Sequence, residues 1–98
     1  MKMATARYQS GSRFAELQGT LSPSEDGTSV VVDTASDIPS EFLSAAQSGA
    51  EKMMESLGLS GAITITGATM RPESSAKDFL AAGMILVDTL DQTPDVET

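Results

Sequence analysis

The first part of the chain alternates between apolar and polar positions with a period of two, which is typical of β-strands that have one face in water. The alternation is clearest over residues 13–21, and a shorter run over residues 5–9 precedes it. The link between them contains glycine and favours a hairpin. Three consecutive valines mark a third strand over residues 28–33, after a segment rich in turn-forming residues. We therefore expect a three-stranded meander.

From Pro39 the apolar and small residues recur every three or four positions, which is the period of an amphipathic helix. Proline suits the first helical turn, because its missing N–H would have no partner there. Gly58 suits the end of the helix, where a left-handed backbone conformation is common. The pattern predicts a helix over residues 39–57.

A fourth strand is predicted over residues 62–70, where isoleucine alternates with threonine. A second helical stripe follows, and either Ser74 or Ser75 is suited to cap its first turn. Residues 91–98 carry a proline and three acids with little apolar content, so we expect a flexible acidic tail.

The predicted order is β-β-β-α-β-α. Ninety-eight residues leave room for one hydrophobic core, so residues 1–90 should form a single domain. Strands with one apolar face need a covering layer, and the two amphipathic helices can supply it. We expect an α+β fold in which a four-stranded sheet is covered on one face by two helices.

The amino-acid composition limits the range of possible functions. The chain contains no cysteine and no histidine, which excludes disulfides, thiolate chemistry, imidazole general bases and the usual zinc ligand sets. Fourteen acids against six bases give a formal charge of −8, which repels nucleic-acid backbones, so RNA contact has to be local and no DNA partner is expected. No apolar run is long enough to span a membrane. We expect a cytoplasmic protein without cofactor or metal.

Several segments of the chain together resemble one known family. The start of the first predicted helix and the turn that follows it are similar to the I-P-x-E-[YF] helix and G-x-L-x-G turn in the fourth domain of translation elongation factor G. Two further segments fit, namely the glycine-containing hairpin link and the serine pair before the second helix. The residues that carry the resemblance are Gly11, Phe14, Pro23, Ile38, Pro39, Glu41, Phe42, Ala45, Gly49, Leu59, Gly61, Ser74, Ser75 and Phe79.

The resemblance covers roughly residues 5–88 and implies the fold of the second domain of ribosomal protein S5. In the family, the hairpin loop and the loop before the second helix form a tip that enters the decoding site. Both loops are shorter here, and the histidine of the second loop is absent. The corresponding binding residues in this chain are Ser10, Gly11, Ser12, Arg13, Met70 and Arg71.

Arg13 and Arg71 are the tip residues best suited to bind an anion, because a guanidinium makes bidentate contacts with phosphate or carboxylate. The alternative is that both are ordinary solvated arginines, paired with Glu16 or Glu73. The serines near the tip have no base to activate them, so capping and turn hydrogen bonds explain them. We predict no catalytic residue.

Two functions therefore remain open. The first is a non-enzymatic translation-related module that binds the ribosome, RNA or a translation factor. The second is a protein-interaction or oligomerisation module that no longer functions on the ribosome. In that case an edge strand or the open face of the sheet contacts a basic protein partner or a second copy.

Overall fold

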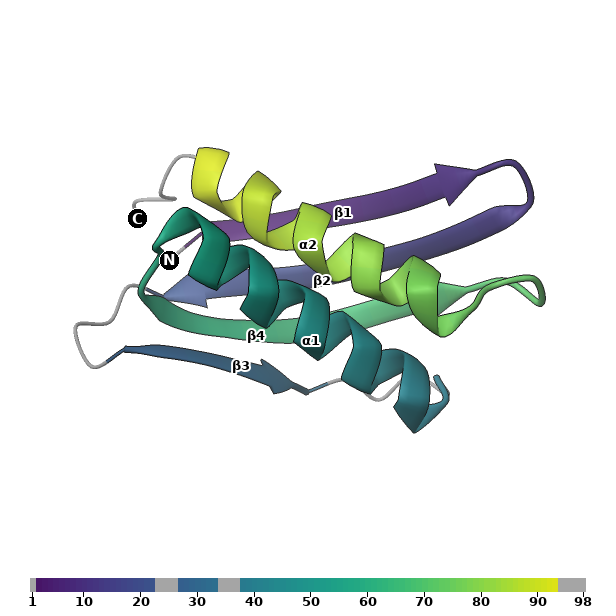
Figure 1. The fold of residues 1–98 in the computed structure, drawn as a ribbon, viewed down its shortest axis with the longest axis horizontal. Coiled ribbons are helices and arrows are strands. Elements are labelled where there is room, and N and C mark those ends of the chain that lie inside the picture. Colours follow the sequence, from purple (N-terminus) through teal and green to yellow (C-terminus); the bar gives the residue numbers. More distant parts are fainter. Residues whose placement is uncertain (1, 23–26, 34–37, 94–98) are drawn as a thin grey trace.

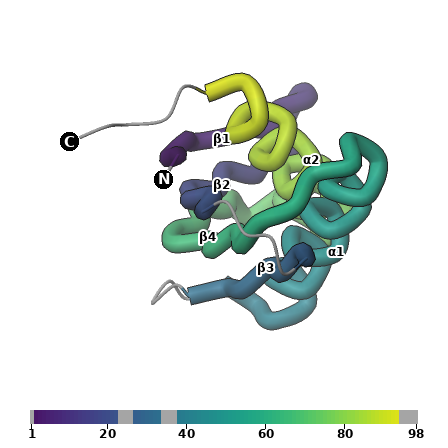
Figure 2. The backbone as a smooth tube through the Cα atoms, turned by 90° about the vertical axis from the view of Figure 1, so that its left-hand side faces the viewer, coloured from purple at the N-terminus to yellow at the C-terminus, as the bar shows by residue number. Residues whose placement is uncertain are grey.

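A computed structural model describes residues 2–22, 27–33 and 38–93 and confirms the predicted fold class. Two helices cover one face of a four-stranded sheet, and the other face is open (Figures 1 and 2). The elements are β1 (Lys2–Ser10), β2 (Arg13–Ser22), β3 (Thr28–Val32), α1 (Ser40–Leu57), β4 (Gly61–Met70) and α2 (Ala76–Gln92).

The strand order is β1-β2-β4-β3, so the expected meander of the first three strands is wrong. β2 pairs antiparallel with both β1 and β4, whereas β3 pairs only with β4, in parallel. The lengths of the strands explain the outcome. β2 and β4 are ten residues each and pair along most of their length, and the five-residue β3 is left at the edge.

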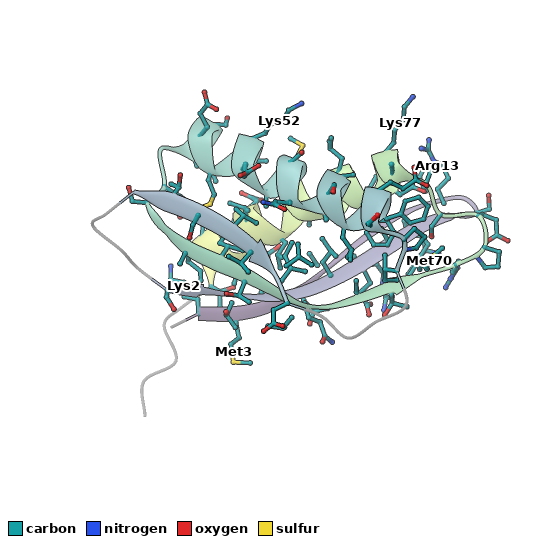
Figure 3. The ribbon with its side chains drawn as sticks, turned by 90° about the horizontal axis from the view of Figure 1, so that it is seen from below. Lys2, Met3, Arg13, Lys52, Met70 and Lys77 are labelled. Atoms are coloured by element: carbon teal, nitrogen blue, oxygen red, sulfur yellow. The ribbon has the colours of Figure 1, made fainter. Side chains whose placement is uncertain are left out.

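The connection from β3 through α1 to β4 is left-handed. In Figure 1, β3 and β4 both run from left to right, β4 lies above β3, and α1 returns in front of the sheet. Figure 3 shows both helices on that same side. About 98% of connections between parallel strands are right-handed. The hand of this crossover is therefore a more specific mark of the fold than the order of its elements.

The core lies between the sheet and the helices. Every second residue of β2 from Ala15 to Leu21 is buried, as the alternation predicted, and Ile63 and Ile65 of β4 lie beside them. The helices contribute small residues and a few large ones, and the rings of Phe42 and Phe79 stack at 5.2 Å. Five of the fifteen buried residues in the core cluster are alanines, whose small side chains allow the two layers to approach closely.

The helices touch each other through glycine. A Cβ atom on Gly49 of α1 would lie 2.1 Å from the carbonyl oxygen of Leu80 in α2. A Cβ atom on Gly83 of α2 would lie 2.2 Å from the carbonyl oxygen of Ala46 in α1. Both obstacles are backbone atoms, which have no alternative rotamer. The helix separation therefore depends on these two glycines.

Most element boundaries match the expectation to within one residue. β1 begins three residues earlier than predicted, and α2 ends at Gln92 rather than near residue 90. Two residues of the predicted acidic tail, Asp91 and Gln92, are thus helical, and residues 94–98 lie outside the described residues. Ser75 is the N-cap of α2, and Gly58 ends α1 with a φ of 67°. Within the described ranges, neither helix is long and apolar enough to cross a membrane.

Candidate binding site at the hairpin end

The predicted site residues come together at one end of the molecule, where the β1–β2 hairpin and the loop between β4 and α2 lie side by side (Figure 1). Ser10 pairs with Arg13 across the hairpin, and Gly11 in the turn has a φ of 61°, a conformation that favours glycine. Ala15 pairs with Met70, which places the second loop next to the first. We call this region the hairpin end: residues 7–16, 41 and 69–78.

Arg13 is engaged within the protein. Its Nε atom lies 2.8 Å from Oδ1 of Asp78, and its Nη2 atom donates a hydrogen bond to the hydroxyl of Ser75 at 3.3 Å. Neither Glu16 nor Glu73, the partners considered from the sequence, pairs with it. The Asp78 carboxylate is fully buried, and Oδ1 accepts no hydrogen bond from the described residues. The charge of Arg13 is therefore what compensates this oxygen.

Asp78 also fixes the start of α2. The backbone N–H of Ser75, the N-cap residue, donates a hydrogen bond to Oδ2 of Asp78 at 2.9 Å. This is the arrangement of a capping box, in which the third helical residue reaches back to the cap. Arg13 is thus tied through Asp78 to the first turn of α2. Its role in the structure is to hold the hairpin against the helix.

Phe14 is the residue that sequence reasoning missed. It precedes the core residue Ala15, so it belongs to the open face of the sheet, yet it is only 5% exposed and lies outside the main core cluster. The guanidinium of Arg71 lies 4.3 Å from the centre of its ring, and that of Arg7 lies 5.7 Å from it. Both distances fall within the range of cation–π contacts. An aromatic residue at an open-face position of the alternating segment was the signal available in the sequence.

The position of Arg71 is set by its loop. The hydroxyl oxygen of Ser74 accepts a hydrogen bond from the backbone N–H of Arg71 at 2.9 Å, and the same hydroxyl donates to the carbonyl oxygen of Phe14. One serine thus links the loop to the strand that carries the ring. Among the described residues, Arg71 has no acidic partner, whereas Arg7 pairs with Glu16 at 3.0 Å. Its guanidinium is therefore held in place and available to an external anion.

The remaining predicted residues divide into two groups. Ser10, Gly11 and Ser12 are exposed in the hairpin turn. Met70 is half-buried and packs against the core from the helix side of the sheet, so it does not share a surface with Arg71. The structure therefore leaves the turn and Arg71 as accessible contacts at the hairpin end.

Charge is distributed unevenly along the chain. Figure 3 shows Arg13 and Lys77 at the hairpin end and Lys2 at the opposite end. Four of the six basic residues belong to the hairpin end, and four acids accompany them, so the described residues of this end are formally neutral. The other two bases and ten acids account for the whole net charge of −8. The basic residues are Arg7, Arg13, Arg71 and Lys77, and the acids are Glu16, Glu41, Glu73 and Asp78.

A hollow of about 330 Å³ lies elsewhere, over the join of β1, β2 and β4. The pairing of β2 with β4 shifts by one residue between Gln18 and Gly19, which leaves Thr66 as an extra residue at this point. The lining contains no titratable side chain; its residues are Met3, Ala4, Thr5, Gln18, Gly19 and Thr66. In the part of the chain that the structure describes, no group of acids is arranged to bind a metal ion.

Neither a scan against protein-family models nor a search of curated proteins finds a match to the chain. The fold and the hairpin end therefore carry the functional argument.

Proposed function

We propose that the chain is a non-enzymatic module of translation, related to the fourth domain of elongation factor G, that binds ribosomal RNA through its hairpin end. The observation that carries the proposal is the guanidinium of Arg71, which is stacked on Phe14 and has no acidic partner among the described residues. Arginine on an aromatic ring is well suited to phosphate, because stacking fixes the plane of its five N–H donors.

The charge distribution supports a local contact. Net charge of −8 repels a phosphate backbone at long range, but the formally neutral hairpin end lets one part of the molecule approach. Such a protein binds weakly and in one orientation, which suits a module that docks into a cleft between RNA elements.

The hollow over β1, β2 and β4 supports a role without chemistry. Its lining contains no titratable side chain that could act as a general acid or base. Binding to the ribosome also implies a cytoplasmic location for the protein.

Replacement of Arg71 by alanine is expected to weaken binding to purified ribosomes about tenfold, because one charge-assisted contact with phosphate is lost. Co-sedimentation over a series of salt concentrations measures the effect. The slope of log affinity against log salt should fall by about one unit.

Lys52→Ala is the matched control, because Lys52 is an exposed base on α1, away from the hairpin end (Figure 3). It should leave the affinity within about twofold of the unmodified chain. Failure of the chain to sediment with ribosomes at low salt would overturn the proposal. Equal weakening by both substitutions would show that the contact is not at Arg71.

A further inference from the structure

The outer edge of β3 presents backbone groups that no strand of the described chain pairs with. Consecutive residues of a strand direct their N–H and C=O groups to opposite sides. The N–H of Asp33 donates to the carbonyl oxygen of Ile65 in β4 at 2.9 Å, so the odd-numbered residues of this segment face β4. Thr28, Val30 and Val32 must then face outward.

One outward group is occupied by a side chain. The amide Nε2 of Gln47, on α1, donates a hydrogen bond to the carbonyl oxygen of Val30 at 3.1 Å. A glutamine amide in this position makes the contact that the N–H of a neighbouring strand would make. Covering an edge in this way is a recognised means of limiting strand addition. The bond therefore shields the central residue of the strand and leaves Thr28 and Val32 exposed to pairing.

We propose that the partner for this edge is a second copy of the chain, joined β3 to β3 in antiparallel orientation about a two-fold axis at Val30. This register sets Thr28 opposite Val32 of the other copy and Val30 opposite its own equivalent. The outward N–H and C=O groups of one copy then lie opposite those of the other copy, and about six hydrogen bonds form between them. The product is a continuous eight-stranded sheet with the helices on one side. The inference is independent of the proposed function.

The composition of β3 favours this partner. The strand has no charged residue although the chain carries −8, and Val31 on the open face is 53% exposed. The register sets Ser29 opposite Val31, so the two exposed valines flank the axis. Asp33 comes opposite Gly27 rather than another acid. The other edge strand, β1, carries Lys2 and Arg7, and charged side chains on an edge strand disfavour pairing with another chain.

The proposed axis also determines where α1 of each copy lies. In Figure 1 its N-terminal turn lies beyond the end of β3, so a two-fold rotation places the corresponding turns at opposite ends of the strand pair. Gln47 has to release Val30 for the ladder to close. Because Gln47 and the second copy compete for the carbonyl oxygen of Val30, substitution of Gln47 tests whether this edge is the interface.

Gln47→Ala should strengthen self-association about fivefold, because it removes the competing hydrogen bond from the monomer only. Thr28→Pro should weaken it more than tenfold, because it deletes an outward donor from each copy. Proline suits the first residue of an edge strand. Sedimentation equilibrium over a wide concentration range, in about 0.3 M salt to screen the charge, measures the change from 10.2 kDa towards twice that mass.

Ser48→Ala, at the exposed neighbouring position on α1, is the control and should leave association unchanged. Circular dichroism verifies that Thr28→Pro remains folded. A constant mass of 10.2 kDa for Gln47→Ala at millimolar concentration would overturn the proposal, leaving the edge to a foreign strand or to solvent. Association that Thr28→Pro leaves intact would place the interface elsewhere and equally overturn it.

Discussion

Replacing Gly49 with alanine is expected to lower the free energy of unfolding by about 3 kcal/mol, the upper part of the usual range for overpacking. The new methyl group would lie 2.1 Å from the carbonyl oxygen of Leu80 and 2.9 Å from its carbonyl carbon. Because these are backbone atoms of a buried helix, α2 must move away and its contacts with the core loosen. In an exposed helix the same substitution would raise the free energy of unfolding by roughly 1 kcal/mol. A loss of stability instead of a gain therefore identifies the close contact between the helices.

Urea denaturation followed by circular dichroism measures the effect, with Ser48→Ala on the exposed face of α1 as control. The control should change stability by less than about 0.5 kcal/mol. Gly83→Ala should be similarly harmful, since its Cβ meets the carbonyl oxygen of Ala46. The double variant should cost less than the two losses added, because a single helix displacement relieves both clashes. A Gly49→Ala protein as stable as the parent would refute the close helix contact.

Arg13→Met is expected to destabilise the fold by about 2 kcal/mol, because it leaves the buried carboxylate of Asp78 without a counter-charge. The value is below the usual cost of breaking a buried pair, since the Arg13 side chain is 46% exposed and water can partly replace it. Methionine keeps most of the apolar stem, so the loss reports on charge. Urea unfolding again supplies the measurement.

Arg7→Met is the matched control, because Arg7 also pairs with a carboxylate, that of Glu16, but at an exposed site. Its cost should stay below about 1 kcal/mol. Asp78→Asn should be tolerated better than Arg13→Met, since an amide oxygen can still accept the hydrogen bond from Ser75. In the double variant the two losses should not add, with a coupling of about 1 kcal/mol. Additive losses would contradict a direct pair.

The local pattern of the sequence predicted the elements well, because each has a strong period of its own. The alternation in β2 and the helical stripe from Pro39 both reflect one buried face. The pairing of strands was predicted less well. Neighbours in sequence usually pair, and the meander followed from that rule, but β2 finds a better match in length and apolar character in β4. Nothing local in the valines of β3 reveals a parallel partner separated from it by a helix.

The candidate site was likewise predicted only in part. The sequence placed Arg13 and Arg71 at one end, but it could not distinguish their roles, because both are arginines next to turns. The difference arises from tertiary contacts. Arg13 meets a carboxylate that only the folding of α2 buries, and Arg71 meets a ring from another strand. Met70 was predicted as a binding residue because it precedes Arg71 in the sequence. The alternation of side chains along β4 directs it to the core instead.

The parallel pairing of β3 with β4 has a consequence for synthesis. The β1–β2 hairpin can close as soon as it is made, but β3 has no neighbour until β4 exists, and β4 ends 38 residues after Val32 (70 minus 32). At typical elongation rates of about 5–20 residues per second, that delay is on the order of 2–8 s. During this interval an uncharged valine strand is without its partner. A nascent chain stalled before residue 61 should therefore be the form most dependent on chaperones and most easily cleaved by proteases.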